Sequence, residues 1–301
     1  MDSHEMEPTT FREDQKKGYL YQDFRYFHLR EQKSSEFSSH YHDFYKIVVF
    51  LSGSVTYTIE GKSYFLKPGD ILLVNRYDLH RLSVDGSEPY ERIILWLRLD
   101  FIQNYRNRGC DLASCFGSAR EKRFHLLRLK KDIRDSLFML LTGLEKALEE
   151  PSGSYGAHLL TESLLIQFLI QLNRIYLGNT YIKDRQALHS DKRIEAIIRY
   201  INSHLSDSLT ADLLASRFYF SKSYLMRKFK SETGYSLHQY ILQKRLFMAA
   251  DLIRGGCPST QAAAESGFGD YSVFLKAFKK LFQCLPSNYL SQTEDITGSI
   301  K

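Results

Sequence analysis

The last third of the chain contains two copies of one basic helical pattern, and this repeat constrains the fold more than any other feature. The first copy, SKSYLMRKFKSETG, spans residues 221–234, and the second, DYSVFLKAFKKLFQ, spans residues 270–283. Each copy begins with Ser or Asp, whose short side-chain oxygen can accept an unpaired backbone N–H at a helix start. Each has a Phe-Lys pair at the eighth and ninth positions after this cap. The chain is therefore predicted to build one type of basic helix twice.

Each basic helix follows a shorter predicted helix and a turn. The shorter helices span residues 210–217 and about 259–266, and the turns are residues 218–220 and 267–269. This order is typical of a helix-turn-helix unit, whose second helix enters the major groove of DNA. Apolar residues four positions apart form the buried face of each basic helix, so the other positions point outward. The outward residues predicted to contact DNA are Lys222, Ser223, Met226, Arg227, Lys230, Tyr271, Ser272, Leu275, Lys276 and Lys279.

A longer helix and a local excess of positive charge support this interpretation. Residues 236–254 repeat apolar side chains with the period of a helix, and about 18 residues give a rod of about 27 Å. Successive major-groove faces lie about 34 Å apart. Residues 190–290 hold 14 Lys and Arg against 8 Asp and Glu, whereas residues 1–189 hold 26 against 25. Nearly all of the net charge of +6 is thus where phosphates would be bound.

Residues 190–291 resemble the DNA-binding domain of the AraC/XylS family of bacterial transcription regulators. The resemblance lies in SLTADLLASRFYFSKSYLMRKFKSETG, in the helix that contains QKRLFMAADLI, and in AAAESGFGDYSVFLKAFKKLFQCLPSNY. It implies base-reading roles for Ser223, Met226, Arg227, Tyr271, Ser272 and Leu275 and a phosphate contact for Lys276. Arg227 is suited to a bidentate contact with guanine, and Met226 and Leu275 are suited to thymine methyl groups. The chain departs from the family pattern at Ser259, Ala262, Gln283 and Leu290.

The stretch 45–99 has the pattern of short β-strands. The predicted strands are residues 46–51, 54–59, 63–66, 71–74 and 92–99. They are rich in Val, Ile, Tyr and Thr and are separated by turn signals that contain Gly, Pro and Asp. Short strands at regular spacing predict a small barrel or jelly roll.

Three histidines, His40, His42 and His80, give this barrel a candidate site. The pattern His40-x-His42-x3-Lys46, followed by Pro68-x-Asp70 and His80, resembles the cupin family. Lys46 occupies the place of the cupin metal ligand Glu, and an ammonium has no lone pair for a metal. Three interpretations stay open: a metal site, histidines hydrogen-bonded within the barrel mouth, and a pocket for an uncharged or anionic effector. The effector-binding residues predicted for this pocket are His40, His42, Lys46, His80, Arg92 and Trp96.

Two further helices are predicted between the barrel and the basic repeat, at residues 124–150 and 156–177. The second is apolar around more than half of its circumference, so more than one side should be covered. The family resemblance implies a two-helix antiparallel dimer interface, and full burial within one chain is the alternative. The expected domains are a flexible segment 1–18, a cupin-like barrel 19–105, a helical dimerisation region 106–178, a linker 179–190, a DNA-binding domain 191–291 and a flexible tail 292–301.

At 301 residues the chain is long enough for two domains with separate cores, which gives an α+β multidomain fold. No apolar run approaches the roughly 18 residues of a membrane span, and the acidic, polar start is not a secretory signal. Cys110, Cys115, Cys257 and Cys284 lack metal or redox spacing, which indicates reduced thiols in a cytoplasmic protein.

We therefore expect a cytoplasmic, homodimeric transcriptional regulator that binds promoter DNA and a small-molecule effector and influences RNA polymerase. It is expected to be no enzyme and to hold no metal or other cofactor. Two alternatives stay open: a metal-dependent cupin enzyme fused to a DNA-binding domain, and a constitutive DNA binder with a vestigial barrel.

Overall fold

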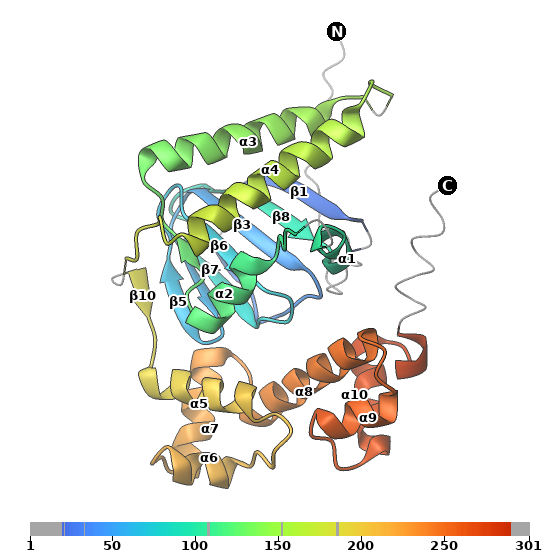
Figure 1. Ribbon diagram of the computed structural model, residues 1–301. Coiled ribbons are helices and arrows are strands. Elements are labelled where there is room, and N and C mark those ends of the chain that lie inside the picture. The colour runs from blue at the N-terminus through green and yellow to red at the C-terminus, as the bar shows by residue number, and fades with distance from the viewer. Residues whose placement is uncertain are drawn as a thin grey trace.

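A computed structural model describes residues 20, 22–32, 34–106, 109–151, 153–184 and 187–289. Its first part is a β-sandwich of two five-stranded antiparallel sheets, with strand orders β1-β8-β3-β6-β9 and β10-β5-β4-β7-β2 (Figure 1). The strands are β1 (Phe24–Glu31), β2 (Ser35–Glu36), β3 (Tyr45–Ser52), β4 (Val55–Ile59), β5 (Lys62–Phe65), β6 (Ile71–Val74), β7 (His80–Val84), β8 (Tyr90–Leu97), β9 (Leu126–Leu127) and β10 (Leu188–His189). The predicted barrel-like fold is confirmed. The predicted flexible segments 1–18 and 292–301 lie outside the described residues.

The central strand β3 is buried on both faces, because successive side chains point to opposite sides of a sheet. Ile47 and Val49 belong to the core under the helices, whereas Val48 and Phe50 belong to the core between the two sheets. This double burial explains why the strand is a continuous apolar run rather than an alternating one.

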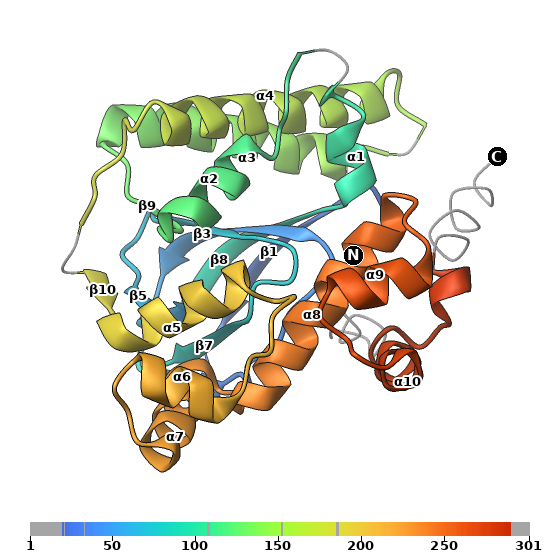
Figure 2. The ribbon, with the colours of Figure 1, turned by 60° about the horizontal axis from the view of Figure 1, so that its bottom comes forward.

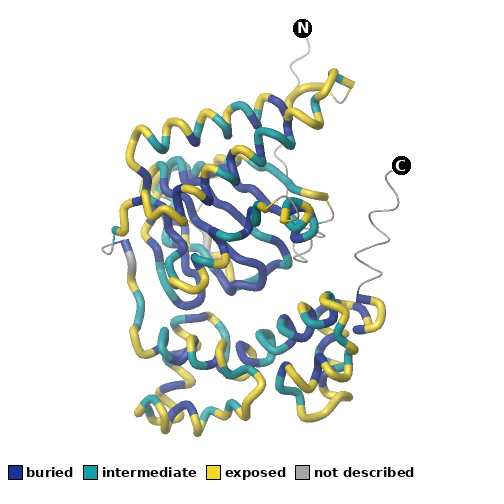
Figure 3. Tube along the Cα trace, in the orientation of Figure 1, coloured by how far each residue is buried: buried dark blue, intermediate teal, exposed yellow. Residues whose placement is uncertain are grey.

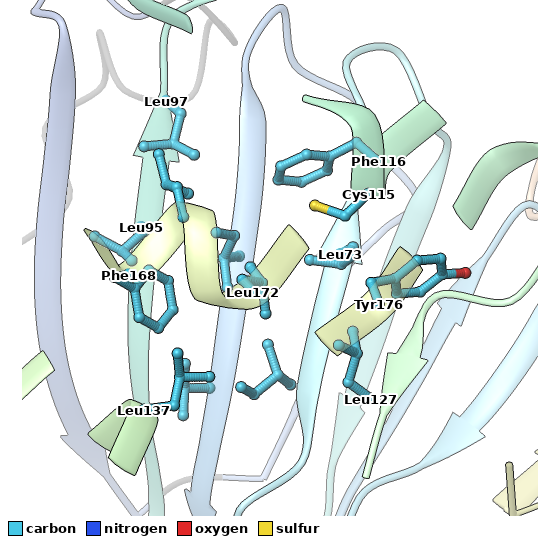
Figure 4. Packing of buried hydrophobic residues seen from close by; sticks show 14 of the residues in the cluster. Leu73, Leu95, Leu97, Cys115, Phe116, Leu127, Leu137, Phe168, Leu172 and Tyr176 are labelled. Carbon is cyan, nitrogen blue, oxygen red and sulfur yellow. The ribbon is translucent and has the colours of Figure 1, made fainter. Parts of the chain in front are cut away.

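Four helices cover the outer face of the first sheet: α1 (Leu99–Gln103), α2 (Ser114–Lys122), α3 (Lys131–Glu149) and α4 (Ala157–Leu177). Phe168, Leu172 and Tyr176 of α4 lie over Leu73 and Leu95 of the sheet, and all five are fully buried (Figure 4). The apolar circumference of α4 is thus partly explained by packing on the sheet and on α3. No helix in the described part of the chain is long and apolar enough to cross a membrane.

The prediction of one helix over residues 124–150 was wrong at its start. Leu126 and Leu127 form β9, which pairs with Leu72 and Ile71 of β6, and α3 begins only at Lys131. Both leucines are fully buried at the sheet edge. Pairing with a strand far away in sequence therefore decided the conformation of a segment whose local pattern also fits a helix.

The segment expected to be a linker follows the sandwich closely. Ile182 forms an isolated bridge with Arg128, and β10 pairs with Tyr64 and Ser63 of β5. The chain therefore runs along the sheet edge before it enters the helical part.

The last part of the chain is helical and contains the two predicted helix-turn-helix units, which are confirmed. Its helices are α5 (Lys192–Ser203), α6 (Ala211–Arg217), α7 (Lys222–Thr233), α8 (Leu237–Arg254), α9 (Ser259–Glu265) and α10 (Tyr271–Phe282), followed by a 3-10 turn (Pro286–Asn288). Helices α5–α7 lie at one end of α8, and α9 and α10 lie at the other (Figures 1 and 2). Each end has its own buried core.

The caps that the sequence predicts are formed. The Ser221 hydroxyl accepts the Tyr224 N–H at 3.3 Å, and the Asp270 carboxylate accepts the Ser272 N–H at 2.6 Å. Such caps satisfy backbone donors that a helix leaves without partners. Exposed and buried positions alternate along α7 and α10 as expected for helices with one covered face (Figure 3).

Candidate DNA-binding surface and effector site

The surface of α7 presents its predicted DNA contacts to solvent. Leu225 and Phe229 are fully buried against the first helical core. All five predicted contacts of this helix are exposed: Lys222, Ser223, Met226, Arg227 and Lys230. The Lys222 ammonium is paired with Asp212 of α6 at 2.8 Å, whereas Arg227 has no ion-pair partner within the described residues. Arg227 is therefore a cation of α7 that is readily available to a DNA base or phosphate.

The surface of α10 follows the prediction at four of its five positions. Tyr271, Ser272, Lys276 and Lys279 are exposed, but Leu275 is half-buried. Val273, which was not predicted, has 56% of its surface exposed. Residues 273, 276 and 280 share one helical face, so counting from the buried Phe274 and Phe278 would have identified Val273 and Lys280. Val273 is thus better placed than Leu275 for contact with a thymine methyl group.

Helix α8 determines the spacing of these two surfaces. Its 18 residues correspond to a rod of about 27 Å. A capping box formed by Ser236 and Gln239 fixes its start. The length of this rod is comparable with the spacing of successive major-groove faces of DNA.

Within the sandwich, five side chains gather into what we name the barrel cluster: His40, His42, Lys46, Tyr57 and His80. The ring of His80 lies 4.3 Å from that of His40 and 4.8 Å from that of His42, measured between centroids. Tyr57 stacks on His80 at 5.9 Å, and the Lys46 Nζ lies 5.7 Å from the Tyr57 ring. The structure thus brings together four of the six residues predicted for an effector site.

The two N-terminal histidines of the cluster precede β3 and belong to no regular strand. His40 forms only an isolated bridge to His80, and His42 lies outside any strand. Backbone hydrogen bonds of 3.0 and 2.9 Å between His40 and His80 hold this bridge. Tyr57 was missed by the sequence analysis, although its position on β4 beside Val55 and Ile59 places it on the inward face.

The hydrogen bonds of the three imidazoles fix which ring nitrogen carries a proton. The Nδ1 atoms of His40, His42 and His80 lie 3.0, 2.8 and 2.9 Å from the carbonyl oxygens of Ser38, Phe44 and Asp78. A carbonyl oxygen only accepts, so each Nδ1 donates and each Nε2 carries a lone pair in the neutral ring. Burial, with the positive charge of Lys46, lowers the pKa of all three imidazoles, that of His40 to about 4. At neutral pH the cluster therefore presents hydrogen-bond acceptors.

Lys46 is a buried cation, with only 8% of its surface exposed. Burial, and after it the neighbouring Arg92, lowers its pKa to about 7. No carboxylate among the described residues forms an ion pair with it. Within that same part of the chain, no group of three His, Cys, Asp or Glu side chains is arranged to hold a metal ion.

The remaining two predicted effector residues lie beside the cluster and take part in structural contacts. Arg92 donates to Glu31 at 3.1 Å and lies over the ring of Tyr90. Trp96 is directly opposite Lys46 in the pairing of β3 and β8 and packs against Phe44 with a centroid distance of 4.6 Å. Trp96 therefore forms an apolar wall next to the lysine.

The sandwich is joined to α8 through Glu60, which lies in the turn after β4. The Lys244 Nζ donates to the Glu60 carboxylate at 2.6 Å, and the Tyr240 hydroxyl donates to its other oxygen. The Leu79 N–H donates to the same carboxylate at 2.8 Å. Lys244 and Glu60 expose only 11% and 9% of their side chains, so this ion pair is screened from solvent.

A second contact to α8 is centred on Asp43. Arg76 donates to Asp43 at 2.6 Å, and Arg254 of α8 donates to its second oxygen at 2.9 Å. Burial raises the pKa of Asp43, but the two guanidinium groups outweigh it and hold the pKa below the usual value. Tyr77 adds an apolar contact by stacking on Phe247 of α8 at 4.4 Å.

A cavity of about 790 Å³ lies between the sandwich and the helical part. Its walls come from β4 and β5, from the end of α2, and from α5 and α8, and they include Glu60, Lys244 and Asp251. The two parts therefore meet around this cavity, and Tyr77 and Leu79 of the sandwich pack into the two cores of the helical part.

Comparison with known proteins gives two family matches. Residues 23–169 match an AraC-like ligand binding domain, and residues 214–292 match a helix-turn-helix domain. The HTH-type transcriptional activator RhaR of Mannheimia succiniciproducens is 25% identical over 272 residues, 87% of this chain and 90% of that protein. RhaS of Citrobacter koseri is 24% identical over 84% of this chain and 87% of its own length. The probable transcriptional regulator LumQ of Photobacterium leiognathi is 26% identical over 83% and 90%.

Similar solved structures include the following two. ToxT from Vibrio cholerae O395 is 18% identical, with a TM-score of 0.36 over 92% of this chain and 99% of that one. The C-terminal domain of the response regulator yesN from Fusobacterium nucleatum is 30% identical, with a TM-score of 0.32 over 33% of this chain and 98% of that one.

Proposed function

Because the chain belongs to the AraC family of DNA-binding, ligand-responsive transcriptional regulators, we propose that an effector bound at its barrel cluster controls how α7 and α10 are presented to promoter DNA. One observation carries this proposal. Three short segments, residues 42–43, 57–60 and 77–80, each supply one residue of the barrel cluster and at least one contact to α8. A ligand that displaces the cluster residues would therefore act directly on the contacts that hold α8 against the sandwich.

The size of such control is limited by the effector's preference for one domain arrangement over the other. A preference of about 1.4 kcal/mol shifts the equilibrium tenfold. The buried Glu60–Lys244 pair and the Asp43–Arg254 pair are formed when α8 lies against the sandwich and would be lost if α8 moved away from it. These two pairs are the proposed bistable element.

On the DNA side, we propose that α7 and α10 enter successive major grooves. Arg227 is assigned to a guanine and Met226 to a thymine methyl group on α7, and Lys276 is assigned to phosphate on α10. Ser223, Tyr271, Ser272 and Leu275 complete the proposed base contacts, and the more exposed Val273 is added beside Leu275 for a thymine methyl group. Lys222, Lys230 and Lys279 are assigned to the DNA backbone. The exposure of nearly all of these side chains supports the assignment.

We further propose that the protein is a cytoplasmic homodimer without enzymatic activity that influences RNA polymerase at its promoters. The relatives named above are transcriptional regulators, which supports a regulatory rather than a catalytic role. For the dimer, the outer faces of α3 and α4 expose large apolar side chains, with 69% of Met139 and 70% of Leu159 accessible. Exposed apolar surface of this kind marks protein interfaces. The proposed domain division is the one expected from the sequence.

Selection of binding sites from random oligonucleotides by the full-length protein tests the DNA-binding assignment. We expect an enriched site with two recognised stretches about one helical turn apart. Arg227→Ala should weaken binding to that site by about 1–3 kcal/mol and relax the base preference at one position. Lys131→Ala changes an exposed lysine of α3, remote from both recognition helices, and should change nothing. Failure to enrich any sequence, or an equal loss on random DNA for Arg227→Ala, would contradict the assignment.

A further inference from the structure

The barrel cluster holds buried polar atoms whose hydrogen-bonding capacity is unused. Among the described residues, the Nε2 atoms of His42 and His80 and the hydroxyl of Tyr57 are buried without a partner. Lys46 is nine-tenths buried and likewise has no carboxylate partner in that part of the chain. Because buried polar groups are nearly always satisfied, three such atoms beside a lysine that lacks a carboxylate indicate a missing partner.

We propose that the effector is a hydroxylated carboxylate, whose carboxylate pairs with Lys46 and whose hydroxyl groups donate to Nε2 of His42 and His80. This inference rests on the proposed function, since it takes the barrel cluster to be the effector site. It adds the chemical class of the ligand.

The carboxylate follows from the charge at the site. A buried ammonium without a counter-charge is strongly unfavourable. A neutral ligand would remove the remaining solvent from the Lys46 ammonium without supplying a negative charge. The neighbouring cation Arg92 already has Glu31 as its partner at 3.1 Å. Lys46 is therefore the cation of the cluster that a ligand carboxylate would pair with, and one negative charge is enough.

The hydroxyl groups follow from the orientation of the imidazoles. Each Nδ1 donates to a main-chain carbonyl, so the two buried Nε2 atoms can only accept while the rings are neutral. A carboxylate oxygen placed against them would meet lone pairs, whereas a hydroxyl group donates to them. A carboxylate without hydroxyl groups would leave both acceptors unsatisfied. The ring of Phe44 stacks on His42 and packs against Trp96, so an apolar wall borders this site.

The test compares ligands that differ in one feature each, by thermal shift and calorimetry on the full-length protein. D-Glucuronate and D-gluconate carry both features, D-glucose lacks the carboxylate, and cyclohexanecarboxylate lacks the hydroxyl groups. Glucose 6-phosphate carries a larger charge. We expect the two hydroxy acids to raise the melting temperature more than any of the other three.

Variants assign the two features to their residues. Lys46→Met should weaken binding of the hydroxy acids about 30-fold or more and remove their advantage over glucose. His80→Phe should bring them to the level of cyclohexanecarboxylate, and His42→Phe replaces it if that variant fails to fold. Lys131→Met, at an exposed lysine of α3, is the matched control and should bind like the unchanged protein.

Proton uptake gives a second readout. The titratable and charged groups facing Lys46 are Arg92, Tyr57 and the three histidines of the cluster, and its pKa is about 7. A bound carboxylate favours the charged lysine, so calorimetry in buffers of different ionisation enthalpy should show proton uptake at pH 7 that Lys46→Met loses.

The inference would be overturned if glucose or glucose 6-phosphate bound with the same affinity as glucuronate. It would also be overturned if Lys46→Met bound the hydroxy acids as tightly as the unchanged protein. Absence of Lys46-dependent stabilisation by either hydroxy acid would also overturn it. A neutral compound that bound the barrel and altered DNA binding would leave the proposed function standing while this inference fell. Failure of the DNA selection would instead count against the proposed function.

Discussion

The Glu60–Lys244 pair offers the sharpest test of how the two parts of the chain are joined. The change is Glu60→Gln, which keeps the shape of the side chain but removes its charge. Lys244 then stays 11% exposed without a counter-ion, since the carboxylate lies 2.6 Å from its Nζ in the unchanged protein. Removing one partner of a buried ion pair costs about 3–5 kcal/mol. We expect a loss of this size in the free energy of unfolding.

A double-mutant cycle separates the pair from the rest of the contact. Lys244→Met should also destabilise, because it leaves the Glu60 carboxylate buried with only the Tyr240 hydroxyl and the Leu79 N–H. The double variant removes both charges and should be far less destabilised than the sum of the two single losses. The exposed pair Lys222–Asp212 is the control, and breaking it should cost about 1 kcal/mol or less.

Urea unfolding can be followed by two signals that report different parts of the molecule. Tryptophan fluorescence reports on the sandwich, because Trp96 is the only tryptophan and lies there. Far-UV circular dichroism is dominated by the helices. The two transitions should separate in Glu60→Gln if the pair joins the parts. Additive single losses as small as those of the control pair would refute the assignment of Glu60 and Lys244 as a joining contact.

Three further predictions concern the cluster, a helix end and the dimer. Between pH 7 and about pH 10.5, the free energy of unfolding of the unchanged protein should rise relative to that of Lys46→Met, because the unfolded chain keeps a proton at Lys46 that the folded protein has released. Below pH 7 the variant should be the more stable by a constant amount. Parallel pH profiles of the two proteins would contradict this. Gln283 ends α10 at a φ of 58°, which glycine adopts more easily, so Gln283→Gly should raise the free energy of unfolding by up to about 1 kcal/mol in thermal unfolding. A decrease would show that the hydrogen bond from the Gln283 side chain to Lys280 contributes more than relief of the backbone strain. Met139→Glu should shift the sedimentation of the protein toward the monomer, and an unchanged dimer would place the interface elsewhere.

The helix-turn-helix units were readable because their signals are local. A cap, a four-residue apolar spacing and a turn lie within about one dozen residues, so Ser221 and Asp270 predicted the starts of α7 and α10. The strands were harder. β1 and β7 were not predicted, because the apolar and polar residues of β1 do not alternate clearly and three of the five residues of β7 are polar.

The barrel cluster was only partly predictable. Its histidines and Lys46 were found from their spacing, but Tyr57 was not, because nothing in the run of β4 distinguishes it from a core residue. Arg92 was predicted for the site, yet its partner Glu31 on a missed strand gives it a structural role. The contacts between the sandwich and α8 had no sequence signal, since Glu60 and Lys244 are 184 residues apart.

The sequence by itself determined the helical repeat, the positive charge of the last third and the strand-rich first part, because these depend on side chains close together along the chain. Only the tertiary structure decided that three histidines, a lysine and a tyrosine meet without a carboxylate among the described residues, and that the same segments touch α8. Burial creates that difference: the residue types set which groups can bear charge, but only the fold removes solvent and fixes which partners they meet.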